Sequence, residues 1–335
     1  GGLGPTIDDL TKEAIAEYLK KDLVIDELHR KEMERKFAER GIEVLSKNLK
    51  EVSVVTDSIV FYNEPGIAPA FYIDGISAFP GVPVELKNMF PKYLDYLKKE
   101  FGLNKKLIIR DFIVWGIPES TLEEKIIGYF NDQKVFLEFL VKDYGIIVRL
   151  VTDEDNKELV EELGKKIYST LGEAVLYEEN RPSQEVLIEK LIKEKMTISL
   201  AESCTGGMIA EKLVSVSGAS QVFEEGLVTY SNEAKMKRLG VNKETLDEYG
   251  AVSSETVEEM LKGLSTNVGI AVSGIAGPLG GTEEKPVGTV YIGIKLNEEL
   301  YINRHLFKGD RERIRIRACY TAINNLLQIL RKRGM

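Results

Sequence analysis

The stretch ISLAESCTGG, residues 198–207, decides how we expect the chain to fold. The apolar run that begins at residue 197 predicts a buried strand, and the apolar positions that follow residue 207 have helical spacing. Residues 202–205 therefore predict a corner between a strand and a helix. In open α/β sheets such corners face the crevice at the carboxyl ends of the strands, where ligands bind. An ordinary helix cap at Thr205 is the alternative interpretation.

Further corners of this kind follow along the chain. VSGAS, residues 216–220, precedes a short helical stretch. GLVTY, residues 226–230, predicts a strand that runs into a helix start at residues 231–235. GIAVS predicts a strand that breaks at GIAGP, residues 274–278. One common crevice is the simplest explanation for small, hydroxyl and amide residues at several strand ends.

Composition narrows the class of protein. The chain has 335 residues and a formal charge of −9, which does not favour binding to nucleic acid or to an anionic membrane. It contains two cysteines, Cys204 and Cys319, and no apolar run of membrane-spanning length, so we expect a reduced, cytoplasmic protein. Its two histidines, His29 and His305, leave little material for a zinc site or a Ser-His-Asp triad.

Residues 1–103 open on GGLGPTIDDLTKEA, which predicts a phosphate loop and a helix that begins near Asp8. Since such a loop normally follows a buried strand, we expect the chain to start inside a domain. A second loop, FPGVP, precedes a helix that contains Glu85. The expected phosphate site consists of Gly1, Gly2, Gly4, Thr6, Pro80, Gly81 and Pro83, with Asp8, Asp9 and Glu85 as ligands of a divalent metal. Solvated acids that complement the helix dipole are the alternative.

Residues 104–180 predict a small α+β unit. The expected order is strand, helix, two strands, helix and strand, with no glycine loop or polar cluster. Trp115 is interpreted as a packing residue. The polar, proline-containing segment 178–183 predicts a linker, and residues 181–335 form the third expected domain.

Several segments resemble a known family. LAESCTGGMIAEKL, SGAS, GLVTYSNEAKMKRLGV, AVSGIAGPLGGTEEKPVGTVYIGI and FKGDRERIR resemble the CinA C-terminal domain, the nicotinamide mononucleotide (NMN) deamidase family, over residues 183–335. The first 103 residues are similar to the CinA N-terminal domain, which is related to molybdopterin-binding proteins, without its preceding strand, helix and strand. The middle unit resembles the KH-like insert. The resemblance implies a three-layer α/β C-terminal domain, an α+β KH-like unit and an incomplete α/β N-terminal domain.

The resemblance implies hydrolysis of NMN to nicotinate mononucleotide and ammonia, without a cofactor. Because histidine is scarce, we expect a serine nucleophile activated by a neutral lysine, with a tyrosine relay. Lys235 falls in the first turn of an expected helix, where the dipole and burial both lower its pKa, and Tyr230 ends the preceding strand. Ser220 is our first choice of nucleophile, followed by Ser203 and then Cys204.

The substrate carries a 5′-phosphate, so the site needs anion-binding groups. Backbone amides at residues 205–207 and the side chains of Arg311 and Arg315 are the candidates. A solvated basic face made of Arg311, Arg313, Arg315 and Arg317 is the alternative. The full expected set of substrate-binding residues is Glu202, Ser203, Thr205, Gly206, Gly207, Gly274, Ala276, Gly277, Arg311 and Arg315.

Two other functions stay open at this point. One is a metal-dependent ADP-ribose pyrophosphatase at Asp8, Asp9 and Glu85, which would add ADP-ribose to NMN as a partner. The other is a competence-related binding protein with no turnover, although the acidic balance disfavours contact with DNA. We expect a homodimer that contacts neither nucleic acid nor a membrane.

Overall fold

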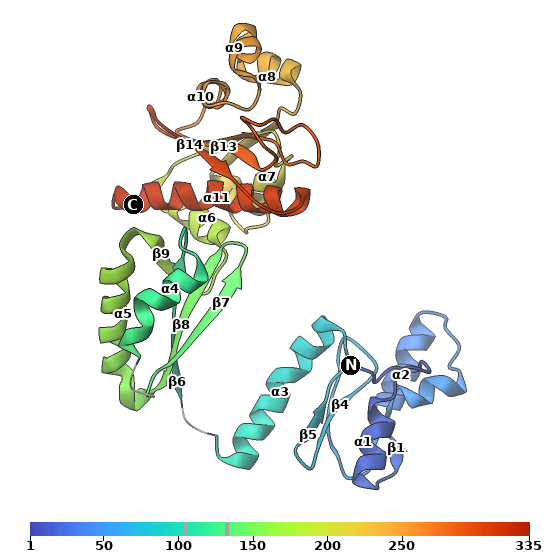
Figure 1. Cartoon of the computed structure of the whole chain (residues 1–335). Coiled ribbons are helices and arrows are strands. Elements are labelled where there is room, and N and C mark those ends of the chain that lie inside the picture. Colours follow the sequence, from blue (N-terminus) through green and yellow to red (C-terminus); the bar gives the residue numbers. More distant parts are fainter. Residues whose placement is uncertain (104–105, 131–133) are drawn as a thin grey trace. The chain divides into compact units, whose positions relative to one another are not determined.

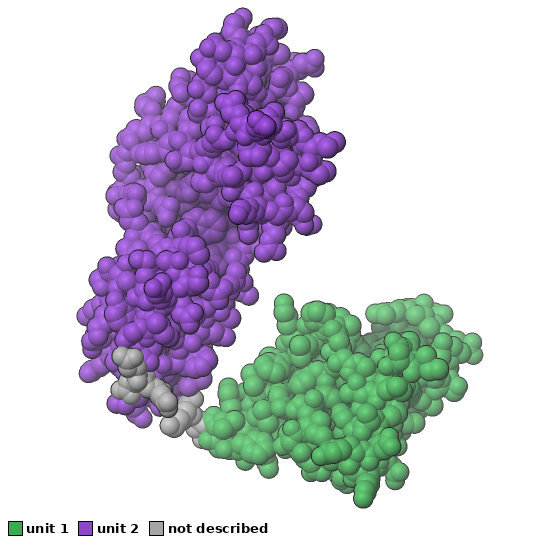
Figure 2. All heavy atoms as spheres, viewed as in Figure 1, with its two compact units in different colours: residues 1–105 green, residues 106–335 purple. Residues whose placement is uncertain are grey.

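The computed structural model describes residues 1–103, 106–130 and 134–335. The chain divides into two compact units, Gly1–Lys105 and Lys106–Met335 (Figure 2). Within the described residues, none of the helices is both long and apolar enough to cross a membrane.

The first unit contains two small antiparallel sheets, one with two strands and one with three. Its elements are α1 (Thr11–Leu19), β1 (Leu23–Ile25), α2 (Glu27–Glu39), β2 (Ser53–Val55), β3 (Ile59–Phe61), β4 (Ala70–Ile73), β5 (Ile76–Ala78) and α3 (Pro83–Phe101). The expectation that α1 begins near Asp8 is wrong. Thr6 donates from its backbone amide to Asp9 at 3.0 Å, which makes a turn, and the helix begins only at Thr11.

The second unit begins with a four-stranded antiparallel sheet in the order β7-β8-β6-β9. Its elements are β6 (Leu107–Val114), α4 (Glu119–Ile126), β7 (Phe136–Lys142), β8 (Gly145–Asp153), α5 (Lys157–Leu171) and β9 (Val175–Glu178). Buried apolar residues of both helices share one core with β6 and β8. This small α+β unit has the element order that the sequence predicts.

The rest of the second unit is built on one five-stranded sheet. Its elements are α6 (Ser183–Glu194), β10 (Ile198–Glu202), α7 (Met208–Val214), β11 (Phe223–Val228), α8 (Asn232–Leu239), α9 (Lys243–Tyr249), α10 (Ser254–Lys262), β12 (Val268–Gly274), β13 (Thr289–Leu296), β14 (Glu299–Leu306) and α11 (Arg311–Lys332). The strand order is β11-β10-β12-β13-β14. Strands β11 and β12 run parallel to β10, whereas β13 and β14 are antiparallel.

Helices cover both faces of this sheet. One core joins α6, α7 and α11 to residues such as Leu200 and Ile270, and the other joins α8, α9 and α10 to Ala201 and Ala271. Since side chains alternate across a strand, neighbouring residues of β10 and β12 enter opposite cores. Figure 1 shows α6 and α11 on one side of β13 and β14, with α8 and α10 on the other. The expected three-layer α/β architecture is confirmed.

The parallel strands bring three corners to the same end of the sheet, where the carboxyl ends of these strands lie. Glu202 at the end of β10 pairs in register with Val228 at the end of β11 and with Val272 near the end of β12. Strand β11 begins at Phe223 and ends two residues before Tyr230, so it lies earlier than the sequence predicts. The segments that follow these strands therefore emerge side by side.

Candidate functional site

The side chains of Lys235 and Ser203 contact each other at this carboxyl end of the parallel strands. Lys235 Nζ donates to Ser203 Oγ at 3.2 Å and to the carbonyl oxygen of Thr229 at 2.8 Å. The lysine is 1% exposed, and burial lowers its pKa because a low-dielectric surrounding disfavours the ammonium form. Ser203 is 8% exposed, so a small part of this residue reaches solvent.

The start of α8 fixes the lysine. Ser231 caps the helix and accepts a hydrogen bond from the amide of Ala234 at 3.1 Å. The cap lies within the helix start that the sequence predicts, and it leaves Lys235 within the first turns of the helix. The positive end of the helix dipole also disfavours a protonated lysine there.

The corner after β10 fixes the serine. The amide of Ser203 donates to the carbonyl of Val272 at 2.9 Å, and its own carbonyl accepts from Gly206 at 3.1 Å. Gly206 and Gly207 have φ values of +63° and +92°, a left-handed backbone that glycine adopts without a steric cost. The chain can therefore turn from strand to helix directly behind the serine.

Glu202 holds this corner together and does not face a substrate. Its carboxylate is fully buried and accepts hydrogen bonds from the amides of Gly207, Ile209 and Ala210 at 2.9–3.1 Å. Because Gly206 and Gly207 already donate within the protein, their amides are not free for a phosphate. The expected anion-binding role of these two amides is therefore not supported.

Ser220 does not lie at this site. It is exposed and sits in the turn Ala219–Gln221, which precedes the first residue of β11, whereas Lys235 follows the last. The strand separates the two residues along its length. The structure therefore does not support Ser220 as the partner of Lys235, because the two corners fall at opposite ends of β11, which the sequence alone did not show.

Cys204 is also a poor nucleophile. It is 5% exposed, and burial raises the pKa of its thiol to about 12. At neutral pH the reactive thiolate is therefore scarce. The side chain packs in the core between the sheet and α11.

The hydroxyl of Tyr230 forms a hydrogen bond with Arg311 and not with Lys235. It is 62% exposed, and its hydroxyl accepts from Arg311 Nη2 at 3.1 Å. Arg311 also donates to the carbonyl of Gly277 at 2.7 Å, so it links the loops that follow β11 and β12. Among the described residues no hydrogen bond joins Tyr230 to Ser203 or Lys235, and a tyrosine relay is not supported.

Arg315 braces the corner from α11. Its Nε donates to the carbonyl of Cys204 at 3.1 Å and its Nη2 to the carbonyl of Thr205 at 2.8 Å. Arg311 and Arg315, one helical turn apart, thus face the same side as the sequence predicts. Each guanidinium keeps further N–H groups with which it could bind an anion.

Gly274 and Ala276 shape the loop after β12. A Cβ atom at Gly274 would lie 2.9 Å from the carbonyl oxygen of Thr289, and Ala276 is 4% exposed. Both positions need small residues for close packing. The loop that they belong to carries the carbonyl of Gly277, which accepts from Arg311.

Two buried threonines complete the surroundings of the pair. The Oγ1 atoms of Thr205 and Thr229 have no hydrogen-bond partner within the described part of the chain, and both residues are at most 1% exposed. A buried hydroxyl without a partner costs about 1–3 kcal/mol, so these two favour a bound water or a polar ligand group. Sequence reasoning missed Thr229, whose one signal is its place directly after a strand.

The first unit brings its two predicted loops together around a small cavity. The cavity has a volume of about 240 Å³, and its lining includes Gly2, Gly4, Asp9, Pro80, Gly81 and Glu85. Gly1 is also close, since a Cβ atom there would lie 3.7 Å from Gly81 Cα. Pro83 is the first residue of α3, where its fixed φ suits a helix start. Glu51 lines the cavity as well, which the sequence did not indicate.

The acids of this unit do not form a metal site. No group of three or more His, Cys, Asp or Glu residues capable of holding a metal occurs in the described ranges 1–103, 106–130 and 134–335. Asp8 and Asp9 both accept hydrogen bonds from the Thr6 hydroxyl, and Glu85 accepts from Asn63 at 2.9 Å. The expected metal-binding set of Asp8, Asp9 and Glu85 does not fit, and no metal-dependent step is assigned to it.

Comparison with protein families gives three matches along the chain. A probable molybdopterin binding domain matches residues 1–99, the damage-inducible protein CinA KH domain matches residues 110–176, and the CinA C-terminal domain matches residues 180–330. The chain is 51% identical to a CinA-like protein of Fusobacterium nucleatum over 99% of its own length and 83% of the relative. It is 40% identical to a putative competence-damage inducible protein of Clostridioides difficile, over 97% and 82% of the two chains.

Solved structures of similar proteins cover part of the chain. A competence-damaged protein (CinA) superfamily protein of Escherichia coli is 34% identical, with a TM-score of 0.43, over 44% of this chain and 88% of that one. A competence/damage inducible protein of Agrobacterium tumefaciens is 39% identical, with a TM-score of 0.41, over 44% and 94%. From the family matches and from the long relatives, we conclude that the chain belongs to the CinA family.

Proposed function

We propose that the C-terminal domain hydrolyses the carboxamide of NMN to give nicotinate mononucleotide and ammonia, with Ser203 as nucleophile and Lys235 as general base. The observation that carries this proposal is the 3.2 Å separation between Ser203 Oγ and the Nζ of a lysine that is 1% exposed. A nucleophile within hydrogen-bond reach of a base with a lowered pKa is the arrangement that amide hydrolysis requires.

The acylation half of the reaction uses both residues. Lys235, as a neutral amine, accepts the Ser203 proton while Oγ bonds to the carboxamide carbon. The C–N bond then breaks, the lysine returns this proton to the departing nitrogen, and ammonia leaves. The carbonyl of Thr229 holds the Nζ atom in place throughout.

Water completes the cycle. Neutral Lys235 takes a proton from a water molecule as its oxygen attacks the ester carbon, and the bond from carbon to Ser203 Oγ breaks. The lysine returns the proton to the serine, and the product acid releases its remaining proton to solvent and leaves as a carboxylate. The unpartnered hydroxyls of Thr205 and Thr229 could bind the carboxamide or this water, since each is a donor and an acceptor.

The phosphate of NMN is assigned to Arg311. This residue is exposed at the start of α11, and its contacts with Tyr230 and Gly277 use only part of its five N–H groups. Arg315 is turned toward the carbonyls of Cys204 and Thr205, so we assign it mainly to holding the corner. No cofactor is needed for these steps.

The experiment that tests this proposal is an assay of ammonia release from NMN by the full chain, with the product identified by chromatography. Ser203→Ala should abolish release, whereas the matched variant Ser220→Ala should keep it. Mass spectrometry of the protein during turnover should show an acyl group on the peptide that contains Ser203. Release of ammonia by Ser203→Ala at the normal rate would refute the proposed nucleophile.

The place of action and the assembly are further parts of this proposal. Both cysteines are free and buried, which suits the reducing cytoplasm that the sequence suggests. A homodimer remains a prediction, to be measured by sedimentation of the purified chain.

A further inference from the structure

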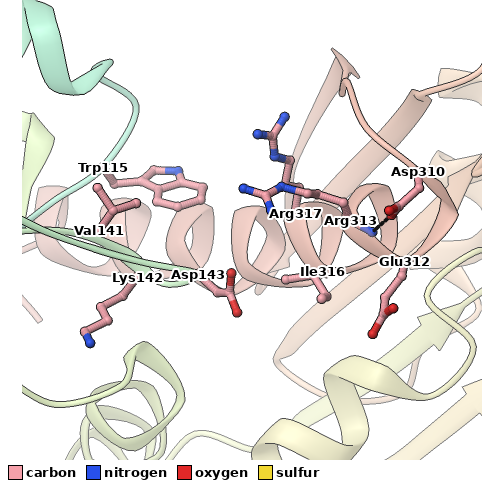
Figure 3. Close-up of a pocket in the computed structure, with 9 residues that line it drawn as sticks. All are labelled: Trp115, Val141, Lys142, Asp143, Asp310, Glu312, Arg313, Ile316 and Arg317. Carbon is pink, nitrogen blue, oxygen red and sulfur yellow. Dashed lines mark hydrogen bonds between the residues drawn. The ribbon is translucent and has the colours of Figure 1, made fainter.

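Two adjoining cavities lie where the small α+β unit meets α11. Their volumes are about 560 and 770 Å³, and Trp115, Lys142 and Arg317 line both. Figure 3 shows the residues of the smaller one. We call the two together the Trp115 cavity. The volume of each part is within the range of sites for small organic ligands.

The larger part suits a planar aromatic group, although Lys142 and Arg317 also belong to its lining. Its lining contains no Asp or Glu and is largely apolar, with Ile117 and Phe307 near Trp115 and amide side chains at Asn325 and Gln328. His305 also lines it, and its Nε2 atom is buried without a hydrogen-bond partner in the described part of the chain. An aromatic ring could stack in such a space while its edge bonds to the amides and the imidazole.

The smaller part is lined by charged groups of both signs, with Lys142, Arg313 and Arg317 as its cations. Arg313 and Arg317 of α11 and the indole of Trp115 face the same space (Figure 3). Neither arginine makes an ion pair within the described residues: Asp310 accepts instead from the backbone amide of Arg313 at 2.8 Å, and Arg317 donates to the carbonyl of Lys308 at 2.9 Å. Asp143, Asp310 and Glu312 also line this part. Because neither arginine is paired with these carboxylates, the two guanidinium groups are the candidate anion-binding groups.

We propose that the Trp115 cavity binds a nucleoside monophosphate, with the base stacked on Trp115 in the larger part and the phosphate bound by Arg313 and Arg317 in the smaller part. Guanidinium groups bind phosphate oxygens through paired, charge-assisted hydrogen bonds. An indole gives any base a stacking surface. A ligand that carries both groups satisfies the two ends of the cavity at once.

This site is distinct from the Ser203 site. Arg311 and Arg315 of α11 contact the loops around Ser203, whereas Arg313 and Arg317 line the Trp115 cavity. Arg311 and Arg315 thus lie on the side of α11 toward the Ser203 site, whereas Arg313 and Arg317 lie on the side toward the Trp115 cavity. Binding at the Trp115 cavity can therefore be tested whether or not the chain hydrolyses NMN.

The test uses the fluorescence of Trp115, the single tryptophan of the chain. AMP is titrated into the full chain, with adenosine and ribose 5-phosphate as probes that lack one end of the ligand. We expect a saturable change with AMP and at least about tenfold weaker binding of either half. The Arg313 side chain forms no hydrogen bond within the described part of the chain, so its removal should not disturb the fold. Arg313→Ala and Arg317→Ala should each weaken AMP binding by about tenfold or more. Arg238→Ala, an exposed arginine on α8, is the matched control and should leave AMP binding unchanged.

Three results would overturn the proposal. The first is the lack of any saturable change with AMP, GMP, CMP or UMP in the millimolar range. The second is AMP binding that survives unchanged in both arginine variants. The third is a single-stranded oligonucleotide that binds more tightly than every mononucleotide, since the cavity would then belong to a polymer site. Arg313→Ala should keep its ammonia release from NMN, so a failed deamidase assay and a failed titration can be told apart.

Discussion

Lys235 Nζ lies 3.2 Å from Ser203 Oγ, although 32 positions separate the two residues in the chain. Parallel pairing of β10 with β11 creates this contact, because it brings the residues that follow both strands to the same edge of the sheet. The lysine reaches that edge from the first turns of α8, and the backbone of Thr229 holds its amine. The two residues are therefore brought together by the parallel arrangement of the strands and not by closeness in the sequence.

If the two residues act as one unit, their removal should be non-additive. Ser203→Ala and Lys235→Met should each lower kcat by about a thousandfold or more, and the double variant should be little worse than either. Initial rates of ammonia release from NMN measure this. Ser220→Ala is the control and should keep kcat within about twofold. Two independent losses that multiply in the double variant would contradict the paired mechanism.

The pH dependence follows from the lowered pKa of Lys235. Only the neutral amine can accept the serine proton, so activity should be full above the pKa of the lysine and fall as the pH drops through it. Because burial lowers this pKa from its ordinary 10.5, the midpoint of log kcat against pH should lie below 10.5. An ascending limb at or above that value would contradict a buried base.

The same shift predicts an effect on stability. In the unfolded chain the pKa of Lys235 has its ordinary value of 10.5, whereas in the folded chain this pKa is lower. The wild type is therefore destabilised as the pH falls from 10.5 through the pKa of the folded state. Lys235→Met removes this penalty and should gain stability relative to the wild type at neutral pH. The advantage should shrink as the pH approaches 10.5. Urea unfolding at several pH values measures it.

Substitutions of Arg311 and Arg315 on α11 should change different kinetic constants. Arg311→Ala should raise the KM for NMN by about tenfold through loss of the phosphate contact, with a smaller change in kcat. Arg315→Ala releases the carbonyls of Cys204 and Thr205 and should lower kcat instead, since the corner that carries Ser203 loosens. Equal effects of both variants on KM alone would contradict these assignments.

Much of the fold follows from periodicity. The apolar run before Glu202 and the helical spacing after Gly207 correctly predict β10 and α7, and the alternation of strands and helices predicts the α+β unit. The nucleophile could not be ranked this way. Ser203 and Ser220 both lie in corners that contain glycine or other small residues, and only the strand ends show that Ser220 lies before β11 while Ser203 lies after β10.

Hydrogen-bonding roles were harder still to predict. Glu202 and Arg315 were expected to bind substrate, yet both bond to backbone atoms of their own corner. A sequence shows which side chains can donate or accept, but the closest partner depends on how the backbone turns. The buried hydroxyls of Thr205 and Thr229 are visible only once burial is known.

Cys204 gives a simple discriminating test. Since burial raises the pKa of its thiol to about 12, it should react slowly with iodoacetamide at neutral pH, and Cys204→Ala should keep kcat within about threefold. Mass spectrometry of the labelled protein and the ammonia assay measure the two effects. Rapid labelling of Cys204 with loss of all activity would instead indicate that the cysteine is the nucleophile.

Glu202 should contribute to stability more than any residue that faces the crevice. Its buried carboxylate accepts from the amides of Gly207, Ile209 and Ala210, which open α7. Glu202→Ala leaves these donors without their acceptor in the interior, and each costs about 1–3 kcal/mol, so the free energy of unfolding should fall by about 3 kcal/mol or more. Glu202→Gln keeps one acceptor oxygen and should lose less. Urea unfolding of both variants measures the difference. If Glu202→Ala unfolds like the wild type while losing its NMN activity, the residue belongs to substrate binding after all, because loss of a structural bond cannot spare the fold and remove the chemistry.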